Sequence, residues 1–257
     1  MTELDNAHAA MEAAPKNDTL RLQFYERLAD TELFMLLGAE VADDQVTPEI
    51  FEIEDQRFTL VFDREERLSQ FVGRVAPYAG LPGRALVQML AGQEIGLALN
   101  LEVAPSAMLI PAEAVDWLLQ TLDNGPQETE GRLQELVRPN VPESVVTGLD
   151  RKLATAAGMA RSAYLAGAIY EDNARGHVLA FLDATEGAEQ ALAAAASEAL
   201  TFSGIEAGMI DVLFVRASDP LAAYLAKVGL RFDLPEKSAS MAPVAPGMDP
   251  KKPPRLR

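Results

Sequence analysis

From Leu133 to Leu234 the sequence alternates short apolar segments with longer segments of helical period, and this order limits the folds open to the chain. The strand-like segments lie at 133–137, 160–170, 177–182, 209–215 and 230–234, and the helix-like segments at 142–157, 188–202 and 220–227. The order is β-α-β-β-α-β with a further α-β. It predicts an α+β sandwich whose helices pack on one face of a mainly antiparallel sheet.

The first half contains the same two kinds of segment in a different order. Helical spacing predicts helices over 4–11 and 19–28, with Asp18 or Thr19 as the N-cap of the second. The run at 57–62 is apolar on both faces, which predicts a central strand. Glu32–Leu37 fits either a buried strand or an extension of the helix before it. The remaining segments predict a strand at 50–53, a loop at 77–82, a helix at 84–90, strands at 95–101 and 107–110, and a helix from 111.

Two breaks divide the chain. Asn124, Gly125 and Pro126, followed by the polar run QETEG, predict a boundary between a first domain at 1–124 and a second at 130–235. Residues 236–257 are rich in proline among serine, alanine and lysine, which predicts a disordered tail. The expected fold class is therefore α+β, with two mixed α/β domains and a disordered Pro-rich C-terminal tail.

Charge and the lack of cysteine exclude several classes of function. The chain has 22 Lys and Arg against 39 Asp and Glu, a net charge of −17. Nucleic acids and anionic membranes attract basic proteins, so we expect neither as a partner. A chain without cysteine forms no disulfide, thiolate nucleophile or Cys-ligated metal site. The opening residues lack the features of a signal peptide and no apolar run is long enough to span a membrane, so we expect a cytoplasmic location.

Five charged residues occupy 63–67, directly after the strand predicted at 57–62. Asp63 is placed to cap a helix that starts at Arg64, with Glu66 completing a capping box. The alternative is functional, because paired carboxylates at a strand end can bind a divalent cation or divide the roles of acid and base. A capped helix with a solvated first turn is the simpler interpretation.

The loop from Asn100 to Ser106 is the second candidate site. Asn100 closes a strand, and Ser106 follows Pro105 in a turn without the GxSxG context of a serine nucleophile. The two histidines, His8 and His177, have no partner at metal-ligand spacing, and no Gly-rich phosphate loop occurs. We therefore expect no metal and no cofactor. The candidate binding residues are Asn100, Pro105, Ser106, Asp63 and Arg64.

Several stretches together resemble one known family. In the first half they are LDNAHAAMEAA with RLQFYERLADTELFMLL, then FTLVFDREERLSQF, then IGLALNLEVAPSAMLIPAEAVDWL. These resemble the N-terminal domain of the SseB (enhanced serine sensitivity) family. LVRPNVPESVVTGLDRKLATAAGMARSAYLA and MIDVLFV are similar to its C-terminal domain, so the resemblance covers about Leu4 to Leu234.

The resemblance implies a bacterial cytosolic protein linked to serine tolerance, and it supplies no catalytic residues. One departure is visible in the loop after Asn100. The family's turn there often reads like Asn-Pro-Gly-Ser, whereas here Leu101, Glu102 and Val103 precede Pro105. If this loop contacts a partner, its shape differs from that of the family.

The sequence and the resemblance together favour a non-enzymatic binding or regulatory protein that contacts another protein or an amino-acid-like small molecule. The competing hypothesis is an enzyme that uses carboxylates, with or without Mg²⁺, on an amino acid or a related metabolite. It requires Asp63 and either Glu65 or Glu66 to converge with another carboxylate in a concave pocket.

Overall fold

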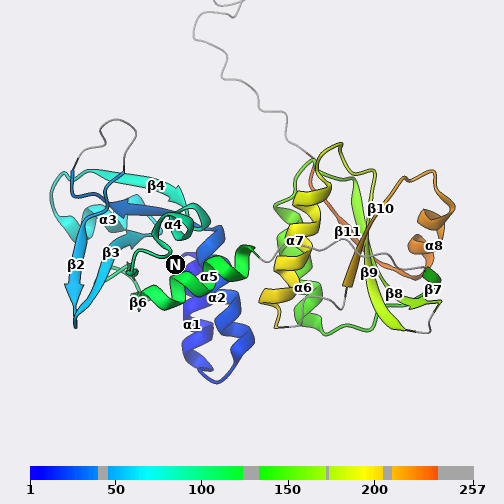
Figure 1. Ribbon diagram of the computed structural model, residues 1–257, viewed down its shortest axis with the longest axis horizontal. Helices are drawn as coiled ribbons and strands as arrows, with labels where there is room; N and C mark the ends of the chain where they lie inside the picture. Colours follow the sequence, from blue (N-terminus) through cyan, green and yellow to red (C-terminus); the bar gives the residue numbers. More distant parts are fainter. Residues whose placement is uncertain (40–45, 124–132, 172–173, 205–209, 237–257) are drawn as a thin grey trace, which may run out of the picture.

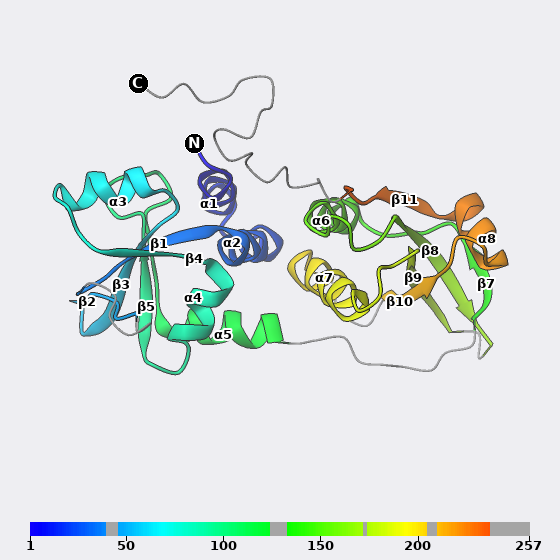
Figure 2. The same cartoon turned by 90° about the horizontal axis from the view of Figure 1, so that it is seen from above.

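The computed structural model places two sheets at opposite ends of the molecule, with helices from both halves packed between them (Figures 1 and 2). It describes residues 1–39, 46–123, 133–171, 174–204 and 210–236. The α+β class predicted from the sequence is confirmed. The predicted boundary at 124–130 and the predicted tail beyond Glu236 lie outside the described residues.

The N-terminal half begins with two helices that pack against each other and continues with a sheet. Its elements are α1 (Glu3–Ala13), α2 (Asp18–Asp30), β1 (Glu32–Leu36), β2 (Ile50–Ile53), β3 (Gln56–Phe62), α3 (Glu65–Val72), β4 (Tyr78–Pro82), α4 (Gly83–Leu90), β5 (Ile95–Leu99), β6 (Met108–Ile110) and α5 (Ala112–Asp123). The strand order is β4-β1-β3-β5-β6, and β2 also pairs with β3. The central position predicted for the strand at 57–62 is confirmed, since β3 is flanked by β1 and β2 on one edge and by β5 on the other.

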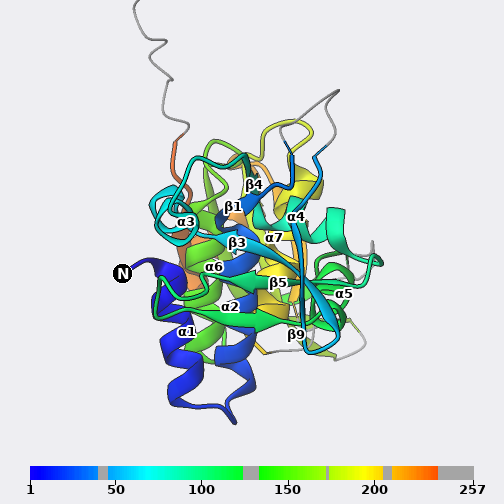
Figure 3. The same ribbon diagram turned by 90° about the vertical axis from the view of Figure 1, so that its left-hand side faces the viewer.

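Strand alternation divides this half into two apolar layers. Leu33, Met35 and Val61 point to the face covered by α1, α2, α4 and α5, where they join the larger buried cluster. Phe58 and Leu60 point to the opposite face, which is covered by α3. Figure 3 views this sheet from its outer side, with β3 and β5 in front of the helices of the second half.

The C-terminal half has the element order expected from the sequence. Its elements are β7 (Leu133–Val137), α6 (Glu143–Ala154), β8 (Ser162–Tyr170), β9 (Arg175–Leu182), α7 (Glu189–Phe202), β10 (Ile210–Val215), α8 (Pro220–Val228) and β11 (Leu230–Asp233). The strand order is β10-β9-β8-β11, and β7 also pairs with β8. The pairs are antiparallel except that of β9 with β10, which is parallel.

The structure differs from the sequence-based expectation at three places in these elements. The segment 77–82, expected as a loop, is the edge strand β4 and pairs along the whole of β1. Its terminal Pro82 is tolerated because an edge strand can do without one N–H. The N-cap of α2 is Asn17, whose side chain accepts from the N–H groups of Thr19 and Leu20, and not Asp18 or Thr19. In the second sheet α6 and α7 cover one face as expected, but Ala222 and Leu225 of α8 cover the other.

The helices of the two halves are in direct contact. Helix α2 packs against α7 (Figure 2). Phe202, at the end of α7, is buried in the apolar cluster of the N-terminal half. Gly204 lies so close to Thr19 that an added Cβ would stand 2.9 Å from the threonine Oγ1. In the described ranges, every helix falls short of the length and hydropathy that spanning a bilayer requires.

Candidate functional site

The parallel strands β3 and β5 end side by side, and a polar side chain follows each of them. Asp63 comes directly after β3 and Asn100 directly after β5. Asn100 has a left-handed backbone with φ of 48°, a conformation that asparagine adopts more readily than most residues. Its backbone N–H donates to the carbonyl of Val61 at 2.9 Å, and its side-chain Oδ1 accepts from the N–H of Asp63 at 3.1 Å. The asparagine therefore joins the two strand ends.

The first turn of α1 is drawn into the same place. Thr2 caps α1 by accepting from the N–H of Asp5, and the Asp5 carboxylate accepts from the N–H of Thr2 in return. The Thr2 hydroxyl donates to the Asp63 carboxylate at 2.6 Å. Ser106 donates to Asp5 Oδ1 at 2.6 Å and accepts from the Asn100 amide at 2.9 Å. Segments distant in the sequence thus meet through side-chain hydrogen bonds.

Arg67 supplies the positive charge between the two acidic side chains. Its Nη1 lies 2.6 Å from Asp63 Oδ1 and 3.0 Å from Asp5 Oδ1, and its Nη2 lies 2.6 Å from Asp5 Oδ2. The side chain of Arg67 is 13% exposed, against 0% for Asp5 and 1% for Asp63. We call this set the strand-end network. Its members are Thr2, Asp5, Asp63, Arg67, Asn100 and Ser106.

The electrostatics of the strand-end network favour the ionised form of Asp5. Burial by itself would raise the pKa of Asp5, but the hydrogen bonds from Arg67 and then from Ser106 hold that pKa well below its ordinary value. The same contact with Asp5 raises the pKa of Arg67 above its ordinary value. Two buried carboxylates and one guanidinium are therefore held together by direct contacts, and Thr2 and Ser106 donate further hydrogen bonds to the carboxylates.

The strand-end network contains three of the five candidate residues named from the sequence. Asp63, Asn100 and Ser106 are buried in it, whereas Arg64 and Pro105 are exposed. The capping role predicted for Asp63 is wrong: the N-cap of α3 is Arg64, and no side chain caps that end. The carboxylate is turned inward, because the guanidinium of Arg67 lies one helical turn away.

Sequence reasoning missed the other three members. Thr2 and Asp5 have the spacing of a capping box, which was a usable signal for the start of α1 but not for its tertiary contacts. Arg67 stands four residues after Asp63, a spacing that permits an ion pair on one helix face. The contact between Asp5 and Ser106 joins residues 101 positions apart, and no local sequence pattern predicts it.

A second feature is a hollow on the surface between α2 and α5. It has a volume of about 320 Å³ and is lined by Arg21, Leu22, Tyr25, Ala114 and Trp117. The rings of Tyr25 and Trp117 meet edge to face with centroids 5.2 Å apart, and Trp117 is 39% exposed. We call these five residues the α2–α5 hollow. A larger concavity of about 700 Å³ is formed by the turn Ala14–Asp18 and is open to solvent.

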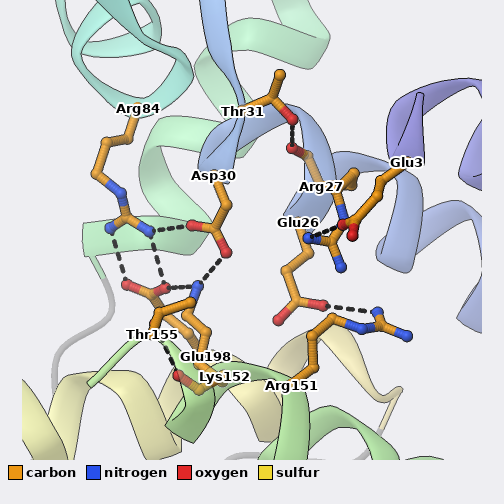
Figure 4. Close-up of polar contacts among 10 residues, drawn as sticks. All are labelled: Glu3, Glu26, Arg27, Asp30, Thr31, Arg84, Arg151, Lys152, Thr155 and Glu198. Carbon is orange, nitrogen blue, oxygen red and sulfur yellow. Dashed lines mark hydrogen bonds and ion pairs between the residues drawn. The ribbon is translucent and has the colours of Figure 1, made fainter. Parts of the chain in front are cut away.

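A third feature is a ring of four charged side chains between the two halves (Figure 4). Arg84 of α4 binds both Glu198 oxygens at 3.2 Å and Asp30 at 2.7 Å. Lys152 of α6 lies 2.7 Å from Asp30 and 2.8 Å from Glu198. We call these four residues the charge ring. Since Asp30 and Arg84 belong to the first half and Lys152 and Glu198 to the second, the charge ring fastens the halves to each other.

Comparison with protein families identifies the first half. Residues 4–117 match the family model described as the SseB protein N-terminal domain. These residues are an SseB N-terminal domain. The strand-end network, apart from Thr2, and the whole α2–α5 hollow lie within the matched SseB domain, whereas Lys152 and Glu198 lie beyond it. Neither the curated proteins nor the solved structures compared with this chain gave a match.

The SseB match bears on the two halves differently. The resemblance of the first half to the SseB N-terminal domain is confirmed. The similarity of residues 130–235 to the SseB C-terminal domain stays a prediction, because the matched range ends at 117. No group of three or more His, Cys, Asp or Glu side chains in the described residues is arranged to hold a metal ion.

Proposed function

We propose that this protein acts by binding another protein, and that the α2–α5 hollow is the contact. The half-exposed Trp117, packed edge to face against Tyr25 beside Arg21, carries the proposal. Trp, Tyr and Arg are the residue types that contribute most binding energy in protein interfaces. The cytoplasmic location and the link to serine tolerance rest on the SseB resemblance and belong to the same proposal.

The shape of the α2–α5 hollow favours a protein partner over a small molecule. Small-ligand sites bury most of the ligand surface inside a cleft and add a few inward-facing polar groups. This hollow is open, and its only charged side chain, Arg21, already pairs with Asp18 at 2.9 Å. A side chain from a partner would fill such a hollow while the surrounding surface excludes water.

The hypothesis of an enzyme that uses carboxylates finds no support in the geometry of the strand-end network. It requires Asp63 and Glu65 or Glu66 to face a shared pocket. Asp63 meets Asp5 instead, with Arg67 bonded to both. Glu65 accepts a hydrogen bond from the Tyr78 hydroxyl at 2.5 Å, and Glu66 is exposed.

Site-specific crosslinking in the native host tests the proposed contact. A photo-crosslinking amino acid at Glu113, exposed on α5 next to Ala114, is compared with one at Ser69, exposed on α3. We expect one defined protein to be captured at Glu113 only, and to be lost when Trp117→Ala is added. Capture that survives Trp117→Ala, or equal capture from both positions, would refute the contact.

Excess free serine separates the two kinds of ligand. If the protein instead binds an amino acid, serine alone will raise the melting temperature of the purified protein. It will also change the fluorescence of Trp117, the single tryptophan of the chain. We expect neither change, because the hollow is open and offers no free charge for an amino acid. A saturable serine response of both signals would replace the protein partner with a metabolite.

A further inference from the structure

Glu26 is a buried acidic side chain in the contact between the two halves. It lies on α2 beside the charge ring and points toward α6 (Figure 4). Its side chain is 5% exposed. Oε2 lies 3.8 Å from Arg151 Nη1, too far for a good hydrogen bond. Oε1 is buried and has no hydrogen-bond partner within the described part of the chain.

Most of the cations around Glu26 are paired with other carboxylates. Lys152 of α6 is held by Asp30 and Glu198 in the charge ring. Arg27, on α2 itself, pairs with Glu3 of α1 at 2.9 Å. Arg84 of α4 is likewise bonded within the charge ring. Among the cations that the described residues place around Glu26, Arg151 alone remains for it, and at 3.8 Å it compensates a buried negative charge poorly.

An ionised Glu26 therefore opposes the contact between the halves. A buried carboxylate with one unpaired oxygen loses its hydration without an equivalent replacement. Because Arg151 and Lys152 both belong to α6, separating the halves would return water to Glu26. A protonated Glu26 has no net charge to desolvate, so it can stay between α2 and α6 at much lower cost.

We propose that Glu26 is a proton-controlled latch between the two halves, closed when its carboxyl holds a proton and loosened when the carboxyl is ionised. The proposal concerns the contact between α2 and α6. It does not depend on the function proposed for the α2–α5 hollow, which lies within the first half alone.

The direction of the pKa shift agrees with this geometry. Burial raises the pKa of Glu26; Lys152 opposes the rise, while Asp30 adds to it. A docked state that binds the proton more tightly than the separated state is favoured as pH falls. The contribution of Glu26 to docking is therefore complete below its ordinary pKa and is lost as pH rises through the raised value.

The carboxylates of the charge ring weaken the contact between the halves at low pH. Burial would raise the pKa values of Asp30 and Glu198, but Lys152 and Arg84 hold both below their ordinary values. Their contribution is present above the ordinary carboxyl pKa and is lost as pH falls through the lowered values. The contact is consequently tightest in mild acid, between the lowered pKa values of Asp30 and Glu198 and the raised pKa of Glu26.

Distance measurement between spin labels tests the latch in the full chain. The natural sequence has no cysteine, so Ser69→Cys on α3 and Ser218→Cys, both exposed, give two defined labels without other changes. From pH 5 to pH 8 we expect the distance distribution to broaden toward longer values. The closed-to-open ratio should fall by at most about tenfold per pH unit, because one proton is coupled.

Two substitutions of Glu26 give the decisive comparison. Glu26→Gln keeps the size without the charge, and Glu26→Ala removes the carboxyl altogether; both should give narrow distributions that do not change with pH. Glu12→Gln, exposed on α1, is the matched control and should keep the pH profile of the unmodified chain. A pH-independent distribution in the unmodified protein, or an unchanged pH profile in both Glu26 variants, would overturn the proposal.

Discussion

Replacing Arg67 by methionine should destabilise the N-terminal half more than any exposed charge substitution. Methionine keeps much of the length of the arginine side chain but removes the guanidinium that bridges Asp5 and Asp63. Both carboxylates would remain buried with no cation between them. Removing one partner of a buried ion pair costs about 3 to 5 kcal/mol. We expect the lower part of this range, because the guanidinium is 13% exposed and water can replace it in part.

The loss can be measured by the fluorescence of Trp117. This single tryptophan lies on α5, so its signal follows the half that contains the substitution. At about 4 °C per kcal/mol for a unit of this size, we expect the melting temperature of that half to fall by roughly 12 to 16 °C. Arg64→Met is the matched control. Its guanidinium is exposed three residues away, and substitution there should cost less than about 0.5 kcal/mol.

The pH dependence gives a second, independent check. In the unmodified protein the pKa of Asp5 is held low by Arg67 and Ser106 against burial, so its stabilising contribution is present above the ordinary pKa and is lost as pH falls through the lowered value. Without the guanidinium, burial remains and the pKa of Asp5 should rise. The deficit of Arg67→Met should therefore shrink between pH 7 and pH 5. A deficit below about 1 kcal/mol at pH 7, or one that grows in acid, would refute the view that Arg67 neutralises two buried carboxylates.

Three further substitutions probe the strand ends, the sheet and the contact between the halves. Asn100→Asp loses the amide donor and adds a third buried carboxylate, so it should lower the free energy of unfolding in urea by about 2 to 4 kcal/mol. Asp183→Asn keeps its accepting oxygen and should be nearly neutral in the same assay. Gly96→Ala places a methyl group 2.4 Å from the carbonyl oxygen of Ile110, and at least about 1 to 3 kcal/mol should be lost in the same assay. Phe202→Ala removes a side chain of α7 that is buried in the N-terminal cluster, so the free energy of unfolding should fall by about 3 to 5 kcal/mol. Small-angle scattering should show the two halves separating at a lower urea concentration than in the unmodified protein.

Local sequence signals were sufficient for most of the secondary structure. Apolar residues on both faces of 57–62 indicated a central strand, because both faces needed cover, and β3 is central. The segment 77–82 was missed as a strand because two prolines and a glycine in six residues are typical of a loop. Its pairing with β1 at the sheet edge overrode that local preference. Helix α8 was placed on the wrong face of its sheet because helical period alone does not say which face a helix will cover.

The candidate residues were predicted less completely than the fold. Asp63 and Asn100 were found because polar residues at strand ends are visible in the sequence. Their roles were not found, since these depend on Arg67 and on contacts with α1, about 60 to 100 residues away in the chain. The aromatic pair of the α2–α5 hollow was also missed. Trp117 falls within a helix whose apolar positions suggested only an inward face, and its edge-to-face contact with Tyr25 of α2 is a tertiary contact that the sequence does not reveal.

The second half contains a counterpart that clarifies what the strand-end asparagine does. Asp183 follows β9, has φ of 49°, and lies beside the parallel strand β10. Its N–H donates to the carbonyl of Val215, and its Oδ1 accepts from the N–H of Ala217. Asn100 makes the same two bonds beside β3, to the residues at the equivalent offsets.

Two unrelated sequence contexts thus use one left-handed residue with a short polar side chain to close a parallel strand pair. The arrangement follows from backbone requirements, because such a residue can end one strand and satisfy the N–H of the next segment at once. The polar residues at the ends of β5 and β9 are therefore accounted for by folding. Any contact with a partner must come from surface residues that the fold leaves unexplained, and the exposed Trp117 is one of these.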